Sequence, residues 1–244
     1  MSIGRHAGNP GAAPVVSTEA LYAIIKELGI IPFFENGIPG FSIEELTPKA
    51  FWFDEGDELG PWDWKIPVVQ SGDIAYGKFL LGKSAFATVP WYRELMNWRH
   101  SLPKYAPEGQ VRQAYDLLLE AGSLSSRELR KQLGLKKSQA DALLTKLQMD
   151  CRIVTGDIQR VYRGPNLTYS GWQLVSFCTP EALFGALSGD DEEDFAAIFG
   201  IGAPKEKSVL EAGHSPAESF DLLFSHIRSV APAATDAQIR KLLG

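Results

Sequence analysis

The hydrophobic pattern of the first ninety residues switches between helical and strand-like spacing. Residues 15–28 carry apolar side chains at i, i+3, i+4 and i+7, namely Leu21, Ile24, Ile25 and Leu28. This spacing predicts an amphipathic helix, with Ser17 as its N-cap and Gly29 directly after its end. The apolar run 30–34 predicts a buried strand or an edge strand, and Pro61 is expected to open a short helix.

Residues 74–89, IAYGKFLLGKSAFATV, predict a β-hairpin. We expect its turn at Gly82 and Lys83, because glycine in the first central position suits a type II′ turn. That register places Phe79 opposite Phe86 and puts Lys83 at the exposed tip. Pro90 then begins a helix over residues 91–99.

Residues 110–162 predict three helices followed by a hairpin. The first helix covers 110–121, and the second starts at a capping box that runs from Ser125 to Glu128 and ends at Gly134. The third starts near Ser138 and buries a stripe of Ala140, Leu143, Leu144 and Leu147. A hairpin around Gly156 and Asp157 completes the order helix, helix, helix, hairpin, which is typical of a winged-helix domain.

The remaining pattern predicts a strand over 172–178, helices over 180–187 and 220–230, and a terminal helix that ends at Leu243. Prolines and a glycine at 103–109 indicate a boundary. We therefore divide the chain into a disordered lead (1–14), a helix and hairpin unit interpreted as a degenerate winged helix (15–106), a winged-helix domain (107–165), and a C-terminal strand and helices (166–244). The predicted fold class is α+β, with winged-helix units packed together and C-terminal helices that cover them or form a homo-oligomer contact.

Composition narrows the class of protein. The 244 residues carry a net charge of −6, which excludes a protein whose whole surface binds nucleic acid and leaves room for a local basic patch. Two cysteines without metal-type spacing and four scattered histidines predict no metal site and no cofactor, and they fit a cytoplasmic protein. No apolar run approaches the roughly 20 residues that span a bilayer, so we expect no membrane segment.

A local basic patch coincides with the second and third helices of the predicted winged helix. Residues 123–152 hold seven basic side chains against three acidic ones. This excess predicts phosphate contacts with double-stranded DNA, made by Lys136, Lys137, Lys146, Arg152 and Arg160, with Lys78 and Lys83 as a second clamp. The outer face of the third helix presents Ser138, Ala142, Thr145 and Met149, which do not favour base readout.

Other interpretations of these segments stay open. The winged helix is alternatively a scaffold for protein contacts, covered by the acidic segments 35–63 and 190–194. Five of the six tryptophans lie between residues 52 and 98, where they fill a core or stack on a base. The carboxylates of residues 35–63 form a solvated face or hide a catalytic pair.

Residues 74–87, followed by Trp91 and Tyr92, resemble the AlkZ-related family of short bacterial proteins. The segment Trp62 to Trp64 and the helices over 129–149 fit the same resemblance, which covers roughly residues 18–162. The family is distantly similar to the AlkZ/YcaQ-type winged-helix DNA glycosylases, which excise alkylated or crosslinked bases. The resemblance therefore implies a winged-helix architecture and a nucleic-acid setting.

The resemblance also implies a candidate catalytic motif. These glycosylases position a water molecule at the sugar with a glutamine, a hydrophobic residue, and a glutamine or aspartate. Gln148, Met149 and Asp150 match the second form. The resemblance thus makes Gln148 and Asp150 candidate catalytic residues of a DNA-repair glycosylase, whereas the structural alternative has Met149 pack and Asp150 cap the turn.

Overall fold

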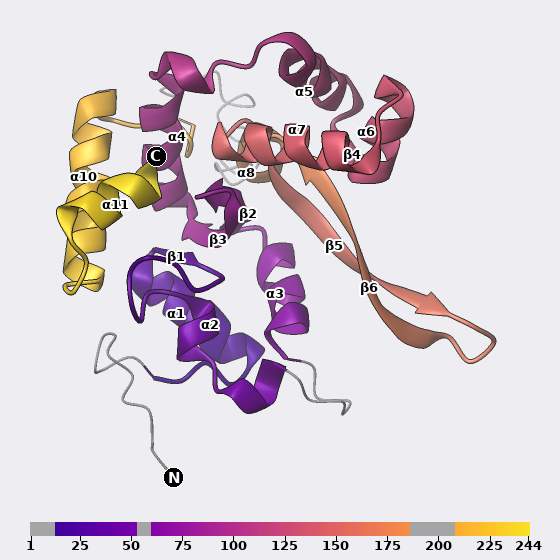
Figure 1. Ribbon diagram of the computed structural model, residues 1–244, viewed down its shortest axis with the longest axis horizontal. Helices are drawn as coiled ribbons and strands as arrows, with labels where there is room; N and C mark the ends of the chain where they lie inside the picture. The colour runs from indigo at the N-terminus through magenta and orange to yellow at the C-terminus, as the bar shows by residue number, and fades with distance from the viewer. Residues whose placement is uncertain (1–12, 53–59, 186–207) are drawn as a thin grey trace, which may run out of the picture.

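The computed structural model describes residues 13–52, 60–185 and 208–244. Helices and two three-stranded antiparallel sheets make up these residues, so the α+β class is confirmed (Figure 1). The predicted lead up to residue 12 and the acidic run 190–194 lie outside the described residues. Four of the eight carboxylates of segment 35–63 lie outside them as well.

The first sheet has the order β1-β3-β2, with β1 Ile30–Pro32, β2 Ile74–Leu80 and β3 Lys83–Thr88. Both of its faces are buried. Helices α1 (Thr18–Leu28) and α3 (Pro61–Gln70) cover the face that carries Ile31, Tyr76 and Phe86. Helix α4 (Val89–His100) covers the other face, together with α10 (Pro216–Val230) and α11 (Asp236–Leu243). The short helices α2 (Ile43–Leu46) and η1 (Lys49–Trp52) lie between β1 and α3 in the chain.

The hairpin of this sheet forms as predicted, but its turn and register were predicted wrongly. Leu81 and Gly82, with φ of 54° and 66°, form the turn, which fits type I′ instead of type II′. A bulge between Gly77 and Leu80 shifts the pairing by one residue, so Tyr76 lies opposite Phe86. Phe79 points to the other face of the sheet, where its ring meets Tyr92 at 5.3 Å.

The second sheet has the order β4-β6-β5 and follows three helices. The elements are α5 Gly109–Ala121, β4 Ser123–Ser125, α6 Ser126–Leu133, α7 Lys137–Met149, β5 Val154–Arg163 and β6 Thr168–Cys178. Leu118, Leu129 and Leu147 join the helices in a core of their own. The capping box at Ser125 is confirmed, and Gly134 ends α6 with a left-handed φ of 63°.

The hairpin after α7 turns later than predicted. Strands β5 and β6 pair along their length and connect through residues 164–167, near the predicted domain boundary at residue 165. Gly156 and Asp157 instead form a bulge, and a Cβ on Gly156 would lie 2.8 Å from Cys178 Sγ. The glycine is therefore needed for close packing of the strands. The outer half of this long hairpin extends away from the helices (Figure 1).

The C-terminal elements return to the first sheet. The short helix α8 (Pro180–Phe184) follows β6, and α10 packs on α4, where Trp91 stacks on His226 with ring centroids 3.7 Å apart. Helix α10 begins at Pro216, four residues earlier than predicted, because Ser215 and Glu218 form a capping box. No helix among the described residues has the length and apolar character needed to cross a bilayer.

Candidate nucleic-acid interface around helix α7

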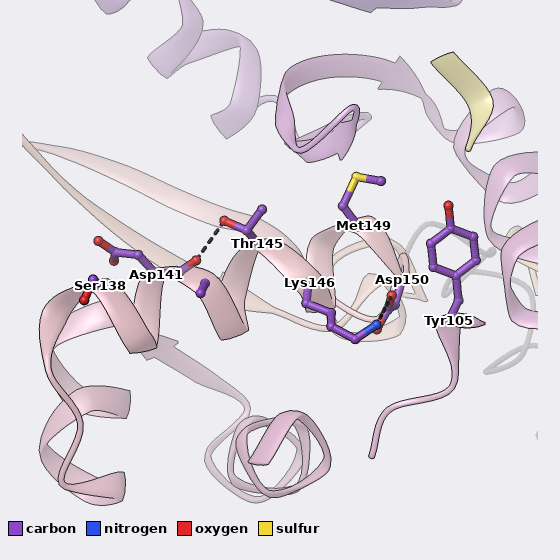
Figure 2. Close-up of a pocket in the computed structure, with 8 residues that line it drawn as sticks. Tyr105, Ser138, Asp141, Thr145, Lys146, Met149 and Asp150 are labelled. Carbon is purple, nitrogen blue, oxygen red and sulfur yellow. Dashed lines mark hydrogen bonds and ion pairs between the residues drawn. The ribbon is translucent and has the colours of Figure 1, made fainter. Parts of the chain in front are cut away.

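Helix α7 separates a buried stripe from an outer face. Ala140, Leu144 and Leu147 are buried as predicted, whereas Leu143 is half-buried. The outer face overlooks an open depression of about 660 Å³. Its lining residues are Tyr105 from the short helix η2 (Pro103–Tyr105) and Ser138, Asp141, Ala142, Thr145, Lys146, Met149 and Asp150 (Figure 2).

The lysines predicted to contact phosphate differ in whether an acidic side chain of the protein compensates their charge. Lys136 and Lys137 are exposed at the start of α7, and neither forms an ion pair with a described residue. Lys146 extends along the helix towards Asp150, one turn further on. Its Nζ lies 3.6 Å from Asp150 Oδ1 and donates to the carbonyl of Lys104 at 3.2 Å. Its charge is therefore partly compensated within the protein.

The other predicted phosphate contacts are distributed over several elements. Lys78 lies beside α7, with its Nζ 3.5 Å from Thr145 Oγ1. Lys83 reaches away to the carbonyl of Glu35 at 3.2 Å. The remaining two are Arg152, which is half-buried, and Arg160, which pairs with Asp63 at 3.0 Å and lies over the ring of Tyr169.

Gln148 uses both ends of its side-chain amide inside the protein. Its Oε1 accepts the backbone N–H of Lys78 at 2.8 Å, and its Nε2 donates to the carbonyl of Leu144 at 2.9 Å. Gly77 makes room for this contact, since a Cβ there would lie 2.9 Å from Oε1. The side chain therefore fastens α7 to strand β2.

Asp150 is a buried acid at the other end of the same motif. Its side chain has no exposed surface, and neither carboxylate oxygen has a hydrogen-bond partner among the described residues. Burial raises its pKa, and the ammonium of Lys146 opposes that shift. Asp150 lines the depression on the outer face of α7, whereas Gln148 lines a different cavity beneath it.

The cavity beneath α7 contains a residue that sequence reasoning missed. It has a volume of about 160 Å³, and Lys65 of α3 lines it from the opposite side. Lys65 is only 7% exposed, and burial lowers its pKa to about 8. A signal was present in the sequence, because Lys65 shares the helical stripe of Trp62, Ile66 and Val69.

Arg99 and His100 have surroundings that the sequence did not indicate. Arg99 of α4 is fully buried. Its neighbour His100 has a pKa lowered to about 4, by burial first and by Arg152 second. In the described part of the chain, no group of three or more histidine, cysteine, aspartate or glutamate side chains could hold a metal ion.

Comparison with known proteins assigns the family. A family model described as "AlkZ related" matches residues 15–244. No curated protein and no solved structure matches the chain. The matched region contains both sheets and every described helix, so the resemblance inferred from residues 18–162 extends to the C-terminal helices. The chain therefore belongs to the AlkZ-related family.

Proposed function

We propose that residues 109–178 form a winged-helix domain that binds double-stranded DNA through phosphate contacts. The order α5-β4-α6-α7-β5-β6 supports this assignment, with α7 in the position of the recognition helix and β5-β6 as the wing. In helix-turn-helix proteins the recognition helix enters the major groove, and its first residues contact the DNA. Membership of the AlkZ-related family supports the proposal of a role with nucleic acid.

The observation that carries the proposal is the pair of lysines at the start of α7. Lys136 and Lys137 are exposed and lack an ion pair with any described residue. The positive end of the helix dipole adds to their charge. The chain as a whole has a net charge of −6, so binding to phosphates has to rely on a local basic patch of this kind.

The same face does not favour reading of bases. Ser138, Ala142 and Thr145 are too short for bidentate contacts with base edges, and the carboxylate of Asp141 lies among them. Arginine and asparagine, which read bases best, are absent from α7. We therefore propose binding without strong sequence preference.

Duplex binding by fluorescence anisotropy tests the proposal. The variant Lys136→Gln/Lys137→Gln should bind more weakly than the wild type at about 50 mM salt, because counterion release contributes most of the affinity. Its plot of log K against log salt between about 50 and 200 mM should be flatter by roughly two units, one per lost phosphate contact. Lys146 is left unchanged, because it compensates Asp150.

A matched control separates local from general charge effects. Lys49→Gln/Lys241→Gln removes the same charge from exposed positions on η1 and α11. We expect nearly wild-type affinity for this control. Unchanged binding by the Lys136 and Lys137 variant, or equal weakening by the control, would contradict the assignment to α7.

A second candidate function is excision of alkylated bases by a DNA-repair glycosylase. The buried carboxyl of Asp150 favours it, because a general base is often a buried acid with a raised pKa. The placement of Gln148 and Asp150 on different cavities argues against joint action on one water molecule. Base release from alkylated duplex that persists in the folded Gln148→Ala/Asp150→Ala variant would exclude this pair as the catalytic residues.

A further inference from the structure

Lys65 is a mostly buried lysine whose amine lies among aromatic rings. Its Nζ lies 4.9 Å from the ring centroid of Trp62, 5.9 Å from that of Tyr76 and 6.0 Å from that of Phe33. No hydrogen bond joins this nitrogen to another described residue, although Lys65 is only 7% exposed. Removing an ammonium from water is costly, so burial favours the neutral amine, whereas the three aromatic rings favour the charged form.

The amine also has access to a space that can hold a ligand. The cavity of about 160 Å³ lies where β2, α7 and the β5-β6 hairpin meet, and Lys78, Ser84 and Thr145 supply further polar groups to its lining. One water molecule takes about 30 Å³ in the liquid. The cavity therefore has room for a ligand of several heavy atoms in contact with Lys65.

The groups around Lys65 leave a fraction of its amine in the neutral, reactive form at neutral pH. Burial lowers its pKa to about 8, and the carboxylate of Asp63 opposes that shift. Asp63 is itself engaged by Arg160 at 3.0 Å. Burial raises the pKa of Tyr76 to about 12, so its phenol stays neutral, and the charged groups Lys78 and Asp141 also line the cavity. A neutral lysine amine attacks carbonyl carbons.

We propose that Lys65 is an amine nucleophile that forms an imine with an aldehyde bound in the cavity between α3, β2 and α7. The lysine nitrogen bonds to the aldehyde carbon, and both of its N–H protons leave with the aldehyde oxygen as water. The step needs no oxidant or reductant. The aldehyde is either the ring-opened sugar of an abasic site in DNA or a small free aldehyde, and the first source rests on the proposed DNA binding.

Reductive trapping on the full chain tests the proposal. An imine reduced by borohydride becomes a stable secondary amine, which peptide mass spectrometry locates. One arm uses duplex DNA with a single abasic site, and the other uses substoichiometric glycolaldehyde. We expect an adduct at Lys65 in at least one arm, with a yield that rises from about pH 7 to about pH 9 as more of the amine becomes neutral.

Two variants identify the nitrogen that reacts. Lys65→Arg keeps a cation but forms no imine, and its yield should fall about tenfold or more, because solvated lysines have a far smaller neutral fraction at neutral pH. Lys49→Arg makes the same change at an exposed position of η1, outside the cavity, and should keep the yield. Lys65→Met repeats the test in case the guanidinium does not fit, and circular dichroism checks that each variant is folded.

The outcomes separate this inference from the proposed function. An adduct with the abasic duplex supports the inference with DNA as the source, and an adduct with glycolaldehyde alone supports it with a free aldehyde, even if anisotropy shows no DNA binding. The absence of a Lys65 adduct in both arms overturns the inference. A total adduct yield that is as high in folded Lys65→Arg as in the wild type also overturns the inference. If the wild type still binds DNA, the proposed function stands in either case.

Discussion

Asp150 shows how one residue at a helix end combines a structural position with an unusual environment. It is the C-cap residue of α7, so its backbone fits the interpretation that it caps the turn. Its carboxyl, however, has no exposed surface and no hydrogen-bond partner among the described residues. A buried acid of this kind makes the stability of the fold depend on pH.

Replacement of Asp150 by asparagine should stabilise the folded protein more at higher pH. Burial raises the pKa in the folded state above the unfolded value of about 3.9, so the folded protein binds the proton more tightly. The stability from this group is full below the unfolded pKa and is lost as pH rises through the folded pKa. The free energy of unfolding of Asp150→Asn, relative to wild type, should therefore be larger at about pH 7 than at about pH 3.5.

Urea unfolding at the two pH values measures this difference. Asp116→Asn is a suitable control, since Asp116 is half of an exposed i,i+4 pair with Arg112. A relative stability of Asp150→Asn that stays constant or falls with pH would show that the carboxyl is not destabilised by burial.

At the scale of elements, the β2-β3 hairpin has a strained turn. Leu81 adopts a φ of 54°, a left-handed conformation that costs a leucine about 1–2 kcal/mol. Its side chain is 37% exposed, so it contributes little core packing in return. Type I′ turns favour asparagine followed by glycine, and Gly82 already occupies the second position.

Leu81→Asn should therefore stabilise the protein by about 0.5–1 kcal/mol, seen as a higher Tm in thermal unfolding. The matched control is Leu119→Asn, which makes the same change at a 51% exposed position of helix α5. Asparagine has a lower helix propensity than leucine, so the control should lose a few tenths of a kcal/mol. Equal losses in both variants would contradict the left-handed turn.

At the scale of the whole molecule, Arg99 joins segments that are far apart in the sequence. From α4 it donates to the carbonyls of Phe79, Met149 and Leu243, so it links the hairpin, the end of α7 and helix α11. Its guanidinium also lies 5.2 Å from the ring centroid of Tyr105. One side chain thus connects the first sheet with the end of helix α7 and with helix α11.

Arg99→Met should lower the free energy of unfolding by about 3 kcal/mol, because it leaves buried carbonyl groups without donors. Urea unfolding followed by circular dichroism measures the change. Arg112→Met, at the exposed pair with Asp116, should cost less than about 1 kcal/mol. A loss below about 1 kcal/mol for Arg99→Met would mean that the three carbonyls find other partners.

The sequence by itself determined the features that depend on neighbouring residues. Ser17 and Ser125 cap their helices as predicted, because a cap needs only the backbone N–H groups of the next turn. The 3.6-residue apolar period located α1, α5, α7 and α10, whereas α3 and α4 were indicated by Pro61 and Pro90, and α6 by the capping box at Ser125. The strand pattern of residues 74–89 located the hairpin. Its register was missed because a one-residue bulge leaves no periodic signal, and its turn because leucine rarely adopts the left-handed conformation of Leu81.

Only the tertiary structure decided which polar side chains are buried and which of them meet. Lysine and arginine usually lie on the protein surface. Lys65 and Arg99 are buried because α3, α7 and α11 pack on the first sheet. Gln148 and Asp150 are two residues apart, yet they face different cavities because successive helical positions are rotated by about 100°. Solvent exclusion and long-range contact are properties of the packed chain, so no local pattern of residues could specify them.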